Sequence, residues 1–438
     1  MILDPLMSES SYTTEQITEI VGGRLVMNSP DDHRIVDLLT DSRKIIHPET
    51  SLFFAINGER HDGHKFIPEL IVQGVRNFVV SDYSENLALL QANFIVVGES
   101  LVAMQKLAAW HRQRFHFPVV GITGSNGKTI VKEWLYQLLR ADKNIVRSPK
   151  SFNSQVGVPL SLWLMNEENQ LGLIEAGISR PGEMEKLQSM IQPTIGIFTN
   201  IGSAHDENFI GPQQKVEEKM KLFLGVDTLI YCKDFPLIHD TVQHTLFDQE
   251  NVRYFTWSKK SKADLQIGRI TKGTDESEIQ GVYNNQFHKI RIPFTDDASV
   301  DNAIHCWSLM IVLGYEQDLI KERMHFLNPV AMRLEMKTGI NNTSVINDSY
   351  NSDIGSLTIA LDFLNQQKQH NTRTIILSDI LQSGRNEENL YREVAGLLQA
   401  KGVDKMIGIG EAILRQQHLF STPAKFFAST EEFLRDAS

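Results

Sequence analysis

Short apolar runs alternate with segments of helical period between about residue 113 and residue 328. The apolar runs are typical of buried strands and fall at 171–176, 194–201, 228–231 and 252–257. The intervening helical patterns include 182–191 and 213–223. Because strands that alternate with helices form parallel sheets covered by helices, the pattern predicts an α/β domain.

The flanking regions predict two further domains. Residues 1–112 mix short strands and helices. Within the central domain, apolar and polar residues alternate with a period of two at 264–292, which predicts a small antiparallel patch. A hinge is expected at Asn328-Pro329, after which a shorter series of strands and helices begins with a strand at 343–347. We therefore expect three domains, at 1–112, 113–328 and 329–438, the last one incomplete at its end.

Composition narrows the class of protein. The 438 residues are 41% hydrophobic, which is ample for several cores, and the net charge of −11 argues against nucleic acid or anionic membranes as partners. Two cysteines cannot build a disulfide framework, and no run resembles a signal peptide or a membrane span. We expect a cytoplasmic protein that does not insert into membranes.

Residues 121–129, Gly-Ile-Thr-Gly-Ser-Asn-Gly-Lys-Thr, lie between an apolar run and a helical pattern. Glycines let the backbone approach phosphate oxygens, the helix N-terminus attracts anions, Lys128 can reach the terminal phosphates, and Thr129 can hold Mg²⁺. The usual first glycine is replaced by Ile122. A tight turn with a surface lysine is the alternative. The expected nucleotide-binding residues are Gly124, Ser125, Asn126, Gly127, Lys128 and Thr129.

Two polar residues follow central strands. Glu175 comes after 171–174, and His205 comes shortly after 196–201. Ligands of open α/β sheets bind beyond the carboxyl ends of the strands, and Mg²⁺ takes one or two protein ligands beside phosphates. A capping or surface carboxylate and an ordinary loop histidine remain the alternatives. Lys219 belongs to a charged helical run, which by itself indicates a solvated face.

Polar segments in the outer domains are candidates for ligand contacts. Asp41-Ser42-Arg43 and Asp62-Gly63-His64 surround a predicted strand at 51–56, and they indicate either an anion-binding loop or ordinary turns. Arg333 follows the hinge and could close onto phosphates, while Asp348 ends the strand at 343–347. A salt bridge and a turn are the alternative for this pair.

Taken in order along nearly the whole chain, these segments resemble the Mur ligases of peptidoglycan synthesis, and within them the MurF branch. The likeness includes the displaced glycine of the phosphate loop, the UDP-binding block, and Asn153 before Gly157-Val158-Pro159. It implies a three-domain α/β architecture: a central P-loop ATPase with a parallel sheet, an N-terminal UDP-binding α/β domain and a C-terminal Rossmann-like α/β domain.

The resemblance also implies residue roles. Lys219 stands where the family has a lysine carbamylated by CO₂, so Lys219 and His205 would hold one Mg²⁺ while Thr129 and Glu175 hold another. Asn302 would contact adenine, and Arg333 and Asp348 the rest of ATP. Lys128, Glu175, His205 and Lys219 would be the catalytic residues. The UDP-linked substrate would be bound by Asp41, Ser42, Arg43, His64 and Asn153.

The implied reaction uses ATP to phosphorylate the carboxylate of UDP-N-acetylmuramoyl-tripeptide, after which the amine of D-alanyl-D-alanine attacks the acyl phosphate. A monomer is expected. The chain departs from the family at Ala298-Ser299 and at Asp353-Ile354. It also stops at Ser438, before the family's usual last strand and helix. We therefore expect it to be part of a longer polypeptide, and fusion to an alanine racemase is one such arrangement.

Several alternatives remain open on the residues. MurE adds a diamino acid to the UDP-dipeptide and shares the N-terminal block, although the Glu175-Ala176-Gly177 segment favours MurF. Folylpolyglutamate synthase shares the ATPase core but lacks a UDP block. A P-loop hydrolase without ligase activity, or a fragment that only binds UDP-sugar, are the remaining alternatives.

Overall fold

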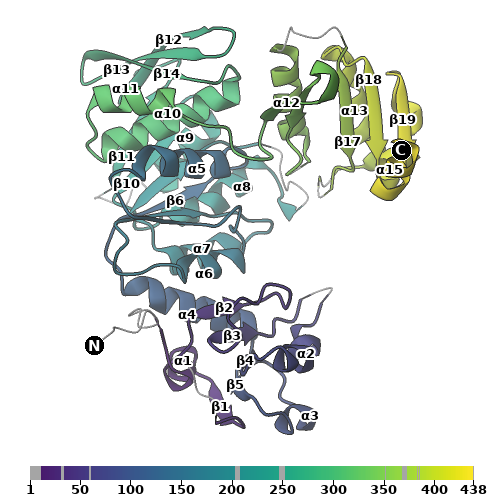
Figure 1. Cartoon of the computed structure of the whole chain (residues 1–438). Coiled ribbons are helices and arrows are strands. Elements are labelled where there is room, and N and C mark those ends of the chain that lie inside the picture. Colours follow the sequence, from purple (N-terminus) through teal and green to yellow (C-terminus); the bar gives the residue numbers. More distant parts are fainter. Residues whose placement is uncertain are drawn as a thin grey trace. The chain divides into compact units, whose positions relative to one another are not determined.

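The computed structural model describes residues 11–30, 34–58, 61–202, 208–245, 252–350, 352–366, 372–381, 383 and 385–437 (Figure 1). Its chain forms two compact units. The first comprises residues 1–121, 142–177 and 183–194, and the second comprises 122–141, 178–182 and 195–438. The domain limits expected at residues 112 and 328 remain a prediction.

The N-terminal part of the first unit is a five-stranded sheet of order β1-β5-β4-β3-β2. All neighbours are parallel except β1 and β5. Two apolar clusters of buried residues cover it, one of which includes residues of α1 and α4 and the other residues of α2. Strands and helices are β1 Arg24–Met27, β2 Asp37–Leu39, β3 Ser51–Phe54, β4 Asn77–Val80, β5 Asn93–Val96, α1 Thr14–Val21, η1 Gly63–Phe66, α2 Ile67–Val72, α3 Glu85–Ala88 and α4 Ser100–Gln113.

A nine-stranded sheet has the order β14-β13-β12-β11-β10-β9-β6-β8-β7. The pairs β7–β8, β9–β10, β10–β11 and β11–β12 are parallel, as the apolar runs predict, and β12, β13 and β14 form the predicted antiparallel patch at one edge. Its strands are β6 Val119–Thr123, β7 Ile145–Arg147, β8 Leu171–Glu175, β9 Ile195–Phe198, β10 Thr228–Cys232, β11 Arg253–Ser258, β12 Leu265–Lys272, β13 Ser277–Tyr283 and β14 Gln286–Ile292.

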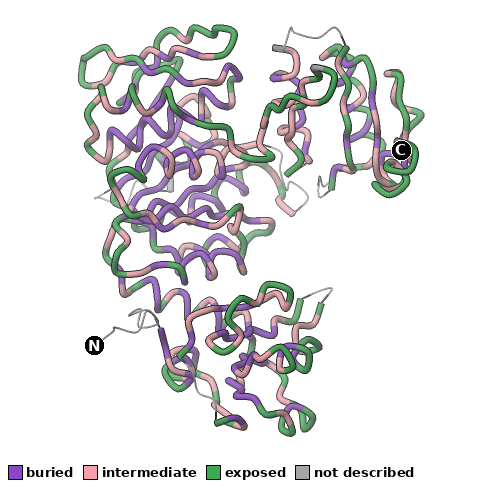
Figure 2. The backbone as a smooth tube through the Cα atoms, viewed as in Figure 1, coloured by how far each residue is buried: buried purple, intermediate pink, exposed green. Residues whose placement is uncertain are grey.

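Helices bury the inner strands of this sheet. Every residue of β6, β8, β9 and β10 is buried, which explains why these strands are continuous apolar runs (Figure 2). Among the described helices, none is long and apolar enough to cross a membrane. The helices are α5 Lys128–Leu139, α6 Gly157–Leu162, α7 Glu183–Ile191, α8 Pro212–Met220, η3 Lys221–Phe223, α9 Pro236–Thr245, α10 Asp297–Val312 and α11 Gln317–His325.

The C-terminal part has a three-stranded parallel sheet of order β17-β18-β19 and a separate antiparallel pair, β15-β16. The predicted strand at 343–347 is therefore present, but it is not part of the parallel sheet. It pairs instead with β15, which lies just before it across a short turn. The elements are β15 Glu335–Thr338, η4 Ile340–Asn342, β16 Ser344–Asn347, α12 Ile354–Gln366, β17 Thr374–Ser378, α13 Glu387–Ala400, β18 Lys405–Ile409, α14 Glu411–Arg415, η5 Gln417–Leu419, β19 Ala424–Phe427 and α15 Thr430–Ala437.

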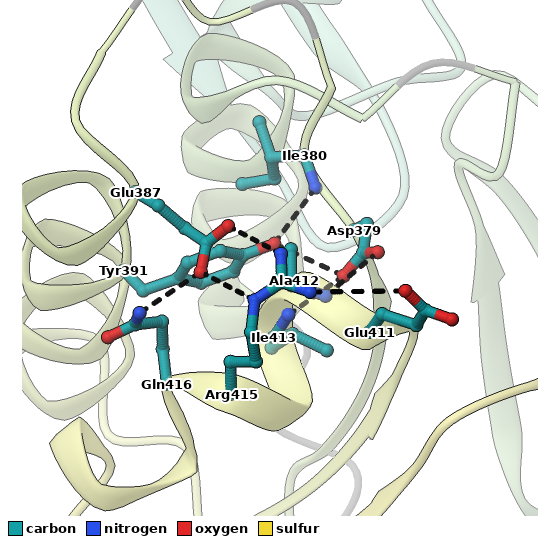
Figure 3. A network of polar contacts seen from close by, with 9 residues as sticks. All are labelled: Asp379, Ile380, Glu387, Tyr391, Glu411, Ala412, Ile413, Arg415 and Gln416. Carbon is teal, nitrogen blue, oxygen red and sulfur yellow. Dashed lines mark hydrogen bonds and ion pairs between the residues drawn. The ribbon is translucent and has the colours of Figure 1, made fainter.

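A polar network fixes the turns at the carboxyl ends of β17 and β18 (Figure 3). The Asp379 carboxylate accepts the backbone N–H groups of Ala412 at 3.2 Å and Ile413 at 2.8 Å, at the first turn of α14. Gly410 is needed beside it, because a Cβ there would lie 2.4 Å from the Asp379 Cγ. The carboxylate therefore satisfies the unpaired donors of a helix N-terminus.

Candidate nucleotide-binding site

The phosphate loop, residues 121–129, is clamped by a strap formed by residues 199–202 after β9. Ser125 N–H donates to the carbonyl of Asn200 at 2.9 Å, and Asn126 N–H donates to the Asn200 Oδ1 at 2.9 Å. The Thr199 hydroxyl donates to the carbonyl of Asn126 at 2.6 Å. Both strap residues fall in the apolar run at 194–201 that precedes His205, but the sequence does not predict their contact with the loop.

Two glycines of the loop are required by close contacts. A Cβ at Gly124 would lie 2.0 Å from the Thr199 Oγ1, and a Cβ at Gly127 would lie 2.3 Å from the Asn302 Oδ1. Gly127 also has a φ of 83° and precedes the first residue of α5. These contacts explain why glycines stand at positions 124 and 127, and they bring Asn302, which is buried on α10, to the loop.

The loop lysine is held inside the loop. Lys128 Nζ donates to the carbonyls of Gly124 at 2.8 Å and Ser125 at 2.9 Å. An ammonium placed among loop carbonyls is positioned to exchange them for phosphate oxygens. This arrangement does not favour the alternative of an ordinary surface lysine. Thr129, the following residue, is buried in the first turn of α5.

Two further lysines approach the same loop from α8. Lys219 is 3% exposed, and its Nζ donates to the carbonyl of Gly124 at 3.2 Å; Lys215 is 2% exposed and donates to the carbonyl of Gly202 at 2.6 Å. Burial, then the charges of Lys128 and Lys215, hold the pKa of Lys219 well below its usual value. A solvated face, which the charged run alone indicates, is therefore wrong for these two residues.

Glu175 and Asn153 meet in the first unit. Glu175 is 1% exposed, which excludes a surface carboxylate, and its Oε1 accepts a hydrogen bond from the Asn153 Nδ2 at 2.7 Å. Its backbone N–H donates to the Ser148 hydroxyl at 3.1 Å. A residue expected to bind the UDP-linked substrate thus orients a residue expected to hold Mg²⁺.

The predicted UDP-binding loop lies near the segment that carries Asn153. Arg43 Nε donates to the Asp41 Oδ1 at 2.9 Å, and this contact holds the pKa of Asp41 well below its usual range. The next residue, Lys44, has its Nζ 5.8 Å from the ring centroid of Phe152. The structure therefore brings residues 41–44 together with residues 152–153, all within the first unit.

His64 is engaged on both ring nitrogens. Its Nε2 accepts the backbone N–H of Ser81 at 3.1 Å, so Nδ1 carries the proton and donates to the Asp62 Oδ1 at 2.7 Å. The ring thus ties the turn at 62–64 to the end of β4. A direct contact between His64 and substrate remains a prediction.

Arg333 and Asp348 lie close to each other beside the β15–β16 pair. The Arg333 Cζ is 3.9 Å from the ring centroid of Tyr350, and the Asp348 Oδ1 accepts the backbone N–H of Leu334 at 3.2 Å. Burial raises the pKa of Asp348 to about 6. Met332 and Leu334 have positive φ values of 57° and 50°, which are strained for such residues.

The metal site expected from the sequence is divided among different parts of the chain. Thr129 and Lys219 belong to the second unit and Glu175 to the first, while His205 lies outside the described residues. Among the residues that the structure describes, no group of three or more His, Cys, Asp or Glu side chains could hold a metal ion. The ligand set remains a prediction.

Comparison with known proteins shows which family the chain resembles. The Mur ligase middle domain matches residues 122–310. The UDP-N-acetylmuramoyl-tripeptide--D-alanyl-D-alanine ligase of Bacillus subtilis (strain 168) is 27% identical over 406 residues, which are 91% of this chain and 85% of that protein. Residues 122–310 are thus a Mur ligase middle domain, and the chain is similar to Mur ligases over nine-tenths of its length.

Solved structures agree with this assignment at the level of the fold. A crystal structure of MurF from Acinetobacter baumannii matches this chain with a TM-score of 0.81 at 22% identity, covering 98% of this chain and 92% of that one. The MurF ligase from Thermotoga maritima in complex with ADP matches with a TM-score of 0.75 at 20% identity, covering 92% and 90%. The predicted α/β Mur ligase architecture is confirmed.

Proposed function

We propose that this chain joins D-alanyl-D-alanine to UDP-N-acetylmuramoyl-tripeptide at the expense of ATP, as MurF enzymes do. The observation that carries the proposal is the clamped phosphate loop with two lysines on one carbonyl, in a chain related to MurF ligases over nine-tenths of its length. The same relatives favour this reaction over the MurE reaction and over a P-loop hydrolase.

The loop would bind the phosphates of ATP through its backbone N–H groups and through Lys128, at the N-terminus of α5. Transfer of the terminal phosphoryl group to the tripeptide carboxylate gives an acyl phosphate and ADP. The amine of D-alanyl-D-alanine then attacks the acyl carbon, an amide bond forms, and phosphate leaves with loss of a proton from nitrogen. Positive charge around the loop stabilises the charge that develops on the transferred group.

Mg²⁺ suits the Thr129 hydroxyl and the Glu175 carboxylate, because both are hard oxygen ligands. We propose that Thr129 and Glu175 hold one ion, and that His205 and Lys219 hold a second. When bound, Mg²⁺ would neutralise phosphoryl oxygens. Lys219 would contribute as a carbamate: its neutral, buried amine attacks CO₂, an N–C bond forms, and a proton is released.

The remaining roles are proposed on the same basis. Asp41, Ser42, Arg43, His64 and Asn153 would bind the UDP-linked substrate, whereas Asn302, Arg333 and Asp348 would contact the nucleotide. We further propose that the enzyme acts in the cytoplasm as a monomer, with domain limits near residues 112 and 328.

Phosphate release measured with different substrates tests the proposal. Release should require both UDP-tripeptide and D-alanyl-D-alanine, and Lys128→Ala should abolish it without lowering the melting temperature. Turnover of UDP-dipeptide with a single diamino acid would instead assign a MurE-type enzyme. Release with ATP alone, unaffected by either substrate, would assign a hydrolase, and binding of UDP-sugar without release would assign a binding module.

A further inference from the structure

His305 on α10 is a buried histidine in the second unit, with both ring nitrogens engaged. It is 0% exposed, its Nε2 lies 3.0 Å from the carbonyl oxygen of Thr199, and its Nδ1 lies 3.2 Å from the Trp257 Nε1. An indole N–H can only donate, so Nδ1 is the acceptor and Nε2 carries the proton that is donated to Thr199. Trp257 therefore fixes the tautomer of His305.

The carbonyl that His305 binds belongs to the strap that clamps the phosphate loop. The hydroxyl of the same residue, Thr199, donates to Asn126 in the loop at 2.6 Å. One helical turn before His305, α10 carries Asn302, whose Oδ1 would be 2.3 Å from a Cβ at Gly127. The contact between His305 and Thr199 thus joins the helix beside the loop to the strap that holds the loop.

We propose that His305 is a positioning residue for ATP: by donating to Thr199, it fixes the strap, and hence the phosphate loop, relative to α10. The proposal rests on the proposed ATP-dependent function. Misplacing reacting groups by about 1 Å can cost roughly 100-fold in rate, so a loop released from this contact should bind and use ATP poorly. The substrate sites of the first unit should be unaffected.

The test compares two substitutions that differ in hydrogen bonding. His305→Gln keeps an amide N–H that can reach the Thr199 carbonyl, whereas His305→Leu fills the space without a donor. We expect His305→Leu to raise the KM for ATP by about tenfold or more, and His305→Gln by no more than about threefold, with the KM for UDP-tripeptide unchanged in both. If His305→Leu does not fold, His305→Asn replaces it, because its shorter amide reaches the position of Nδ1 but not that of Nε2.

His111 provides a matched control in the first unit. It is also 0% exposed, its Nε2 lies 3.0 Å from the carbonyl of Met165, and its Nδ1 lies 2.6 Å from the Tyr12 hydroxyl. Burial lowers the pKa of both histidines to about 4. His111→Leu should lower the melting temperature as His305→Leu does but leave the KM for ATP unchanged.

The outcomes separate this proposal from the proposed function. Equal KM values for ATP in His305→Leu, His305→Gln and the wild type would overturn the positioning role, and so would an equal rise in His111→Leu. If the wild type binds ATP in calorimetry but forms no amide, the ligase function fails. The positioning role is then judged by the ATP dissociation constants of the same variants, where the same order is expected.

Discussion

Gly124→Ala is the substitution for which the structure makes the sharpest prediction. Its Cβ would lie 2.0 Å from the Thr199 Oγ1 and 3.0 Å from the backbone N and O of Asn200, and Gly124 has a φ of 147°. A threonine side chain can rotate away, but the backbone of the strap cannot. The loop must therefore move by roughly 0.5 Å to restore van der Waals contact.

The cost follows from these contacts. A non-glycine residue in this backbone region costs about 1–3 kcal/mol, and each weakened hydrogen bond between loop and strap adds about 1 kcal/mol. We expect the free energy of unfolding of the second unit to fall by about 2–5 kcal/mol, which lowers its melting temperature by roughly 5–10 °C. The displacement of the phosphates should lower kcat/KM for ATP by about tenfold.

Phosphate-release kinetics at varied ATP, together with thermal melts, test this prediction against Gly314→Ala. Gly314 also has a positive φ, of 81°, but a Cβ there would meet nothing within 4 Å. Gly314→Ala should therefore lower the free energy of unfolding by about 1 kcal/mol and leave the activity unchanged. If Gly124→Ala matched the control in both melting temperature and kcat/KM, the packing of the loop against the strap described above would be wrong.

Three further substitutions test other parts of the chain. Tyr350→Leu should raise the KM for ATP about two- to fivefold by removing the ring under Arg333, whereas Tyr350→Phe should not; equal KM values would contradict the stacking role. Asp348→Asn should stabilise the protein by about 1–2 kcal/mol at pH 7.5 and not at pH 3.5. The carboxyl pKa of Asp348 is raised to about 6, so its ionisation above that pH lowers the stability of the folded state, and the amide removes this cost. Thermal melts with no such pH dependence would refute this prediction. Arg112→Met should cost about 3 kcal/mol and leave the KM for ATP unchanged, because its buried guanidinium donates to three backbone carbonyls; an unaltered melting temperature would contradict this.

Much of the fold was predictable because burial leaves a periodic trace in the sequence. The apolar runs at 171–176 and 228–231 became β8 and β10, which are buried on every residue, and the alternation at 264–292 became the antiparallel edge. The partner of a strand leaves no such trace. The strand at 343–347 has the same composition whether it joins a parallel sheet or a hairpin, and only the neighbouring β15 decides between them.

The residues of the site also differ in how well the sequence predicts them. The glycines and Lys128 were predictable because a phosphate loop constrains consecutive residues. Thr199, Asn200 and His305 were not, because their side chains contact backbone groups that are distant in the sequence. A signal for the burial of α8 was present, since Val216 and Met220 are apolar at i and i+4.

Lys219 illustrates why a charged run is a poor guide to exposure. In the sequence it is a cation among cations and carboxylates, but in the fold it is buried next to Gly124, where the charges of Lys128 and Lys215 disfavour a third ammonium. The lowered pKa favours the neutral amine, which is the nucleophilic form of lysine. Reaction with CO₂ would convert a site that repels Mg²⁺ into one that attracts it. Arginine could not replace Lys219, because a guanidinium stays protonated even when it is buried beside other cations. The burial that makes this residue hard to recognise in the sequence is thus the property that would suit it to the chemistry.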